Sequence, residues 1–122
     1  MANEITYSVS LSCTKGSMTD KQAPGSQTAD QTTQGEAADI QIIGTSEEDL
    51  AVGDLVAPRW CFLRNLDTTN FIKLGPKSGG NMVECMRLKA GESALFPIAP
   101  SVTLRAIADT ASCKLKKMIL ET

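Results

Sequence analysis

The 122-residue chain has the length of one domain and can bury a single core without a metal ion or obligatory cross-links. Its formal net charge of −2 supplies no excess of Lys and Arg for phosphate contacts, so the composition argues against a nucleic-acid partner. The polar start, Met1 to Glu4, and the shortness of the uncharged stretches predict neither a signal peptide nor a membrane span. We therefore expect a single domain over residues 1–122, made in the cytoplasm.

Residues 5–14 alternate between apolar and small hydroxylated side chains, which predicts a half-buried β-strand. The apolar side of this strand consists of Ile5, Tyr7, Val9, Leu11 and Cys13. In residues 15–38 the composition changes to Gly, Ser, Thr, Gln, Asp and Ala, with Met18 as the only large apolar residue. This stretch cannot build a core. It is either a polar arm that neighbouring chains order, or a surface loop or polar edge strand.

The main β body is expected over residues 39–122. Its first apolar run, Ile40 to Ile43, is followed by the acidic triplet Glu47 to Asp49. Thr45 or Ser46 before these acids is typical of a helix N-cap. The residues that follow are too few and too β-branched for a durable helix, so we expect one turn at most and then a strand.

Two apolar runs flank a turn between Trp60 and Gly75, and this segment holds the single Trp and two of the three Phe. The side chains of residues 67–70, Asp-Thr-Thr-Asn, can hydrogen-bond to their own backbone, which favours a tight reversal. We therefore predict a β-hairpin around which the rest of the chain packs, with Trp60 and Phe62 in or beside the core.

Short apolar runs continue to the C-terminus and are separated by turn signals at intervals of about ten residues. The glycine-rich segment 75–81 predicts a hairpin connection, because it lacks the order of residues that a phosphate-binding loop needs. Pro97 predicts an edge strand or a strand end. The strands expected in this part span residues 82–89, 94–98, 102–108 and 113–120. A total of about eight short strands predicts an all-β fold, a single antiparallel β-sandwich or barrel.

The four cysteines, Cys13, Cys61, Cys85 and Cys113, form no C-x-x-C pair, so we predict neither a structural zinc site nor a redox motif. Two alternatives remain for them. They are buried thiols that behave as small hydrophobes, or they form disulfides within or between chains once the surroundings become oxidising. Strand alternation favours reduced, buried side chains for Cys13 and Cys85 in freshly made protein.

The sequence contains no His, which removes Ser-His and Cys-His nucleophile pairs and the commonest transition-metal ligand. The carboxylates of residues 47–49 lack the ligand spacing of a calcium loop, and we expect them to form a solvated acidic turn. Lys114, Lys116 and Lys117 are expected to be the solvated face of the last strand. We predict no catalytic, cofactor-binding or metal-binding residues and no enzymatic activity.

Several strand and turn segments of the body form a recognisable combination, although none of them is a catalytic motif. They are Ile43–Glu48, Leu50, Gly53-Asp54, Arg64–Ile72, Leu88–Glu92 and Ala106–Ala111. This combination resembles small structural proteins of tailed bacteriophages, from residue 40 to the end of the chain. The polar residues 18–38 and the four cysteines do not belong to that pattern.

The resemblance implies an all-β virion protein made in the host cytoplasm, most specifically a capsid decoration or cement protein that stabilises the head shell. Its partners would be the major capsid protein or other virion proteins, and it would form a homo-oligomer, with a trimer favoured. A tail, neck or fibre-attachment protein is the alternative within the virion. An alternative from another class is a small carbohydrate-binding module that uses Trp60 or Tyr7. No cofactor, nucleic acid or membrane is expected in any of these roles.

Overall fold

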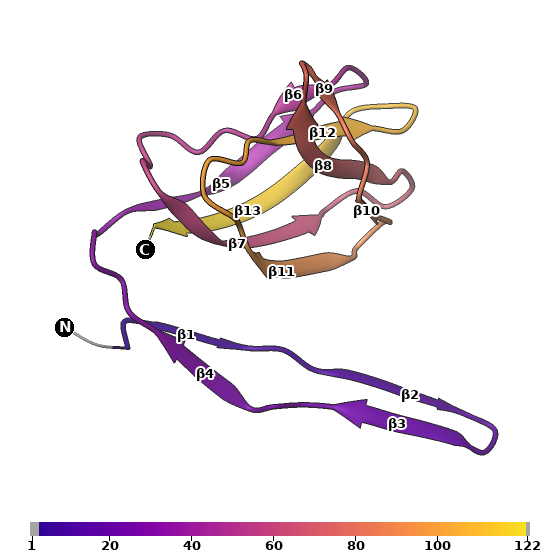
Figure 1. Cartoon of the computed structure of the whole chain (residues 1–122). Coiled ribbons are helices and arrows are strands. Elements are labelled where there is room, and N and C mark those ends of the chain that lie inside the picture. The colour runs from indigo at the N-terminus through magenta and orange to yellow at the C-terminus, as the bar shows by residue number, and fades with distance from the viewer. Residues whose placement is uncertain (1–2, 122) are drawn as a thin grey trace. The chain divides into compact units, whose positions relative to one another are not determined.

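The computed structural model of the chain describes residues 3–121, and every element within that range is a β-strand. All strand pairings are antiparallel, so the predicted all-β fold is confirmed (Figure 1). The chain divides into two compact units, Met1–Gln34 and Gly35–Thr122.

The first unit contains an antiparallel β-hairpin over residues 5–29, which we call the arm. Its strands are β1 (Ile5–Ser8), β2 (Leu11–Lys15), β3 (Met18–Gln22) and β4 (Ser26–Ala29), with β1 paired to β4 and β2 paired to β3. Where the two outer ends of the arm meet, the Asp30 carboxylate accepts a hydrogen bond from the Asn3 amide at 2.7 Å. The Glu4 carboxylate accepts one from the Gln31 amide at 2.9 Å. These bonds close the open end of the hairpin.

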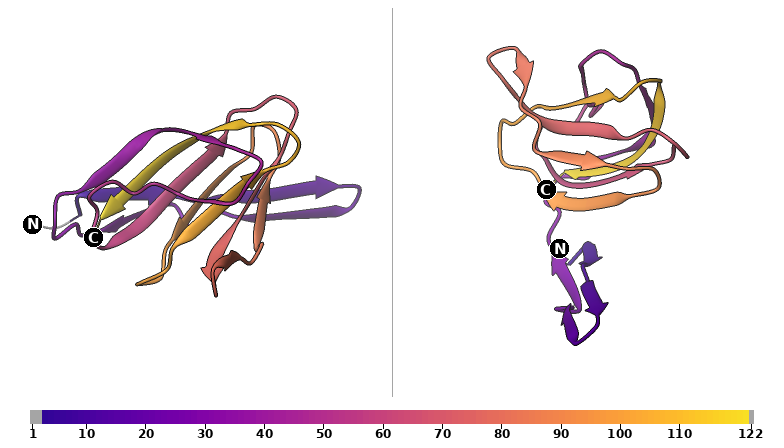
Figure 2. Two further views of the ribbon diagram at one scale, coloured as in Figure 1. Left: turned by 90° about the horizontal axis from the view of Figure 1, so that it is seen from above. Right: turned by 90° about the vertical axis from the view of Figure 1, so that its right-hand side faces the viewer.

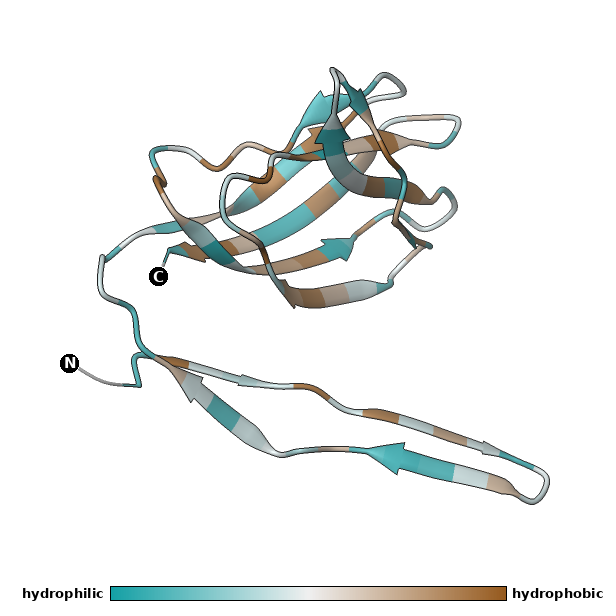
Figure 3. Ribbon diagram, viewed as in Figure 1, coloured by the Kyte–Doolittle hydropathy of each residue, from teal (hydrophilic) through white to brown (hydrophobic). Residues whose placement is uncertain are grey.

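The second unit contains two sheets, and the first of them has the strand order β11-β7-β13-β5. Its strands are β5 (Glu36–Ile43), β7 (Pro58–Asn65), β11 (Ser93–Pro97) and β13 (Cys113–Glu121). β11 is an edge strand that ends at Pro97, as the missing amide hydrogen of proline predicts. β13 lies inside the sheet between β7 and β5, and its residues alternate between buried and more exposed along the strand. Figure 3 shows hydrophobic and hydrophilic bands along the same strand.

The second sheet has the order β10-β8-β12-β6, with β9 paired to the end of β8. Its strands are β6 (Glu48–Asp49), β8 (Ile72–Ser78), β9 (Asn81–Met82), β10 (Met86–Leu88) and β12 (Leu104–Ala108). Gly79 and Gly80 have φ angles of 61° and 91° and form the tight turn between β8 and β9, which confirms the predicted hairpin connection. The strand predicted over residues 82–89 is interrupted between β9 and β10. There, Gly75 of β8 lies so close to Val83 that a Cβ at residue 75 would be 1.8 Å from the Val83 carbonyl oxygen.

The two sheets pack face to face as a β-sandwich around one core (Figure 2). The buried residues of this core are Ile43, Leu50, Cys61, Leu63, Ile72, Leu74, Leu88, Ile98, Ala106, Ala108, Cys113, Leu115 and Ile119. Aliphatic side chains and two thiols supply this core. Phe96 packs against its margin.

The segment between Trp60 and Gly75 is not a hairpin, and that prediction is wrong. β7 belongs to the first sheet and β8 to the second, so the turn carries the chain from one sheet to the other. The turn chemistry itself is as predicted, because the Asp67 carboxylate accepts hydrogen bonds from the amides of Thr69 (2.9 Å) and Asn70 (2.6 Å). Two apolar runs around a turn are compatible with a hairpin in one sheet and with a crossing between two sheets, because the strands of both sheets in a sandwich cover the same core.

Trp60 and Phe62 lie on the outer face of the first sheet, contrary to the prediction that they lie in or beside the core. Cys61 and Leu63 are fully buried, and successive side chains of a strand point to opposite faces. The two aromatic side chains are half-buried there. The aromatic residues do not indicate the buried face of β7, because Cys61 and Leu63, which alternate with them, are apolar as well.

Candidate functional site

One face of the arm carries three exposed apolar side chains. Leu11 and Cys13 of β2 share this face with Met18, because Met18 lies directly opposite Lys15, two residues after Cys13. The polar cross-strand partners of these three residues, Gln22, Asp20 and Lys15, lie on the same face. Leu11 is 74% exposed and Met18 is 56% exposed. Serine and threonine side chains occupy the opposite face of β2. The residues that we call the arm stripe are therefore Leu11, Cys13 and Met18.

The position of the arm differs from the prediction, which placed a polar arm or loop at residues 15–38 and a half-buried strand at residues 5–14. The strands at residues 18–22 and 26–29 pair with residues 5–15, so the predicted strand is one side of the arm. Within that strand only Ile5 is buried. Alternation in the sequence correctly indicates the apolar side of this strand, but it does not indicate whether that side is covered.

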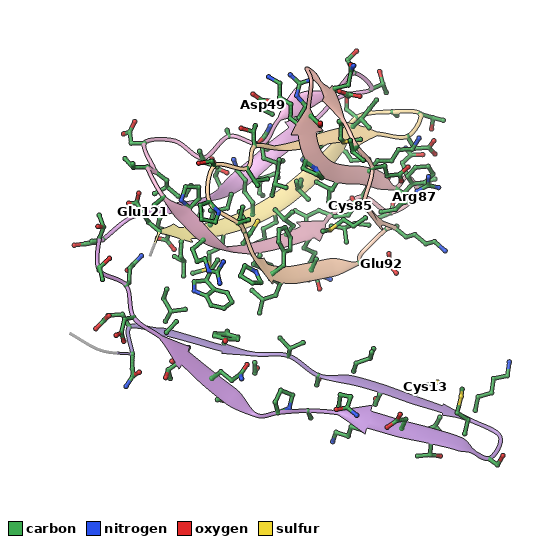
Figure 4. All side chains as sticks on the ribbon, in the orientation of Figure 1. Cys13, Asp49, Cys85, Arg87, Glu92 and Glu121 are labelled. Carbon is green, nitrogen blue, oxygen red and sulfur yellow. The ribbon has the colours of Figure 1, made fainter. Side chains whose placement is uncertain are left out.

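The structure places the four cysteines in two environments, and all four thiols are free. Cys61 and Cys113 are buried in the core, which agrees with the first of the two alternatives, buried thiols that behave as small hydrophobes. Cys13 of the arm stripe and Cys85, between β9 and β10, are exposed, so their predicted burial is wrong (Figure 4). Cys85 lies where the strand pattern breaks next to Gly75, and alternation therefore fails at this position.

Burial makes the two core thiols unreactive. It raises the pKa of Cys61 from 9.0 to about 12, and the positive charge of Lys117 offsets only part of this effect. The pKa of Cys113 is also raised, first by burial and then by the negative charges of Asp67 and Asp109. Neither thiol has the depressed pKa of a catalytic nucleophile.

Glu47 and Asp49 of the acidic triplet at residues 47–49 are exposed to solvent, as predicted, but residues 48–49 form the strand β6 and not a turn. Asp49 and Glu47 accept hydrogen bonds from the Arg105 guanidinium at 2.8 and 3.2 Å, and Asp49 lies in the short strand β6 beside β12. Glu48 accepts a hydrogen bond from the Gly44 amide at 2.8 Å. Asp49 and Glu47 thus join this segment to β12, and Glu48 joins it to the end of β5. In the part of the chain that the structure describes, no group of three or more His, Cys, Asp or Glu side chains is placed to hold a metal ion.

Lys117 is buried, which corrects the expectation that residues 114–117 form a solvated lysine face. Its ammonium group donates to the Gln41 side chain at 3.1 Å and to the Ala51 carbonyl, and lies 3.3 Å from the Asp39 carboxylate. The predicted face is interrupted because Lys116 and Lys117 are consecutive and so point to opposite sides of β13. Lys114 and Lys116 remain exposed.

An apolar pocket of about 330 Å³ opens between residues 52–59 and 98–103. Val52, Leu55 and Val102 form much of its wall. No aromatic ring, carboxylate or thiol is present among the described residues that line it. The pocket therefore lacks both the stacking surface of a sugar-binding site and the groups of a hydrolytic site.

Comparisons of the chain with protein-family models, with curated proteins and with solved structures gave no match. Among residues 3–121 there is no helix long and apolar enough to cross a membrane.

Proposed function

We propose that the chain is a structural protein of a bacteriophage virion, most specifically a capsid decoration or cement protein that stabilises the head shell. In this proposal the β-sandwich is a rigid body, and the arm binds a neighbouring subunit of the virion. The observation that carries the proposal is the arm stripe, three exposed apolar side chains on a two-stranded hairpin that has no second layer among the described residues of its own unit.

The energetics of the two units differ. The sandwich has a continuous core between two sheets. The arm has two strands, and a two-stranded hairpin alone is marginally stable at best in water. Ordering its backbone costs on the order of 1 kcal/mol or more per residue. Covering Leu11 and Met18 on another subunit would offset part of that cost, because burial of apolar area contributes roughly 25 cal/mol per Å².

The proposed partners are the major capsid protein or other virion proteins, together with further copies of the same chain as a homo-oligomer, with a trimer favoured. An arm of this kind can pack its stripe on a neighbouring subunit, or one of its strands can pair with an exposed sheet edge of that subunit. We assign no catalytic role, since the carboxylates of residues 47–49 are held by structural hydrogen bonds and the core thiols are unreactive.

The proposal can be tested with head shells that lack the protein. Full-length chain in which Leu11 and Met18 are both replaced by Asp should lose attachment to the shells in co-sedimentation. The matched control replaces Ser12 and Thr19 by Asp, which adds the same charge to the opposite face of the same two strands. The control should attach like the unchanged protein. Equal attachment of both variants would contradict a role for the arm stripe, and no attachment of the unchanged protein would contradict the shell role.

A further inference from the structure

The outer face of the sheet β11-β7-β13-β5 has an apolar centre. Leu95, Phe62, Met118 and Ala38 are cross-strand partners and form one row across all four strands. In the next row, Trp60 lies between Pro97 and Leu120. We call this surface the outer sheet face.

Towards one end of the outer sheet face, exposed isoleucines alternate with lysines. Ile40 and Ile42 of the edge strand β5 are 54% and 62% exposed. They lie directly opposite Lys116 and Lys114 of β13. Met118, the next outward residue of β13, is 43% exposed. Several exposed apolar side chains gathered on one face are typical of a site of protein association.

The charged side chains on the outer sheet face are positive, with one exception. Arg64 of β7 lies directly opposite Lys116, and like charges in this position destabilise a sheet. Within residues 3–121, neither these two cations nor Lys114 forms an ion pair. The single carboxylate that points outward from these four strands is Glu36, which lies opposite Leu120 at the other end of the face. A partner that brings carboxylates to Arg64 and Lys116 would remove this repulsion.

We infer that the outer sheet face binds an apolar, acidic segment of a partner protein, which covers Ile40, Ile42 and Met118 and places carboxylates beside Arg64, Lys114 and Lys116. The inference rests on the proposed function and adds a second contact, made by the sandwich, to the contact made by the arm. A protein partner is favoured over nucleic acid because the three cations are interleaved with exposed apolar side chains and the chain as a whole carries a net charge of −2.

The test uses the full-length chain and two capped, dye-labelled peptides, one alternating valine and glutamate and one alternating valine and lysine. Binding is measured by fluorescence anisotropy at low and high salt, and the emission of Trp60, the single Trp, reports contact with the outer sheet face. The variant carries Arg64→Glu and Lys116→Glu, which keeps a like-charged pair at the same positions. The control variant carries Lys73→Glu and Lys77→Glu in β8 of the other sheet.

We expect the acidic peptide to bind the unchanged protein and the control, and to bind the Arg64/Lys116 variant at least about tenfold more weakly. The variant should instead prefer the basic peptide. Equal affinity of the variant and the unchanged protein for the acidic peptide would overturn the inference. So would tighter binding of a DNA duplex than of the acidic peptide, or self-association of the chain that changes Trp60 emission without any peptide. The arm proposal is tested separately by attachment to shells, so a failure here does not affect it.

Discussion

At the scale of single residues, Asn65 determines how the chain leaves the first sheet. It is fully buried, and its side-chain amide donates to the carbonyls of Asn70 (2.9 Å) and Leu88 (3.0 Å). Its side-chain oxygen accepts a hydrogen bond from the Asp67 amide at 2.9 Å. One side chain thus joins the turn after β7 to the end of β10. Nothing in the local sequence distinguishes this asparagine from the turn residues that follow it.

Replacing Asn65 by Ala should lower the free energy of unfolding by about 2 to 4 kcal/mol, because one buried carbonyl, one partly buried carbonyl and one amide lose their partner together. Urea unfolding followed by circular dichroism measures the change. Asn81→Ala, at an exposed position in the turn-flanking strand β9, is the control and should change stability by less than about 0.5 kcal/mol. A loss at residue 65 no larger than that of the control would contradict the assigned role.

Cys61 makes stability sensitive to alkaline pH. Its thiol ionises with the ordinary pKa of 9.0 when unfolded, whereas burial raises the folded pKa to about 12. The unfolded state therefore loses its proton first, and the contribution of this residue to stability falls as the pH rises from 9.0 towards 12. Denaturant midpoints measured across that range should fall less steeply for Cys61→Ala than for the unchanged chain. Parallel slopes for the two proteins would contradict burial of the thiol.

At the scale of elements, the sequence predicts strands well and their partners poorly. Turn signals and alternation correctly indicate the strands at residues 93–97, 104–108 and 113–121 and the Gly79-Gly80 turn. Pairing depends on contacts between residues far apart in the chain, so the segment at residues 60–75 fits a hairpin as well as a crossing between sheets. For the same reason the alternation of residues 5–14 predicts a half-buried strand, whereas the strand is one mostly exposed side of the arm. The alternation of residues 5–14 predicts that Leu11 and Cys13 lie on one side of a strand, but it does not predict that this side is exposed.

Gly75 provides a test of the second sheet. A Cβ at this position would lie 1.8 Å from the Val83 carbonyl oxygen. This oxygen is a backbone atom, and moving the backbone of Val83 would disturb the hydrogen bond from the Val83 amide to the Pro76 carbonyl. We expect Gly75→Ala to lower the free energy of unfolding by about 3 kcal/mol. Gly44→Ala is the matched control, because the nearest atom to its added Cβ is the Glu48 carboxylate at 3.8 Å. A Gly75→Ala protein as stable as the control would contradict the close approach of these two segments.

At the scale of the whole molecule, the division into two units predicts that the sandwich is independent of the arm. A chain that begins at Gly35 keeps both sheets and the hydrogen bond from the Glu121 amide to the Gly35 carbonyl at 3.0 Å. It should unfold cooperatively with a urea midpoint close to that of the full chain, because the core of the sandwich lies entirely within the second unit. Loss of cooperative unfolding would show that residues before Gly35 are part of the same folding unit.

The central claim is that the arm joins the chain to a neighbour in a virion shell. Electron cryomicroscopy of head shells incubated with the full-length protein measures this directly. We expect added density for the sandwich on the shell, with the strands of residues 5–29 lying against a different subunit and Leu11 and Met18 covered by it. Shells without added density, or an arm whose stripe contacts no other subunit, would contradict the claim.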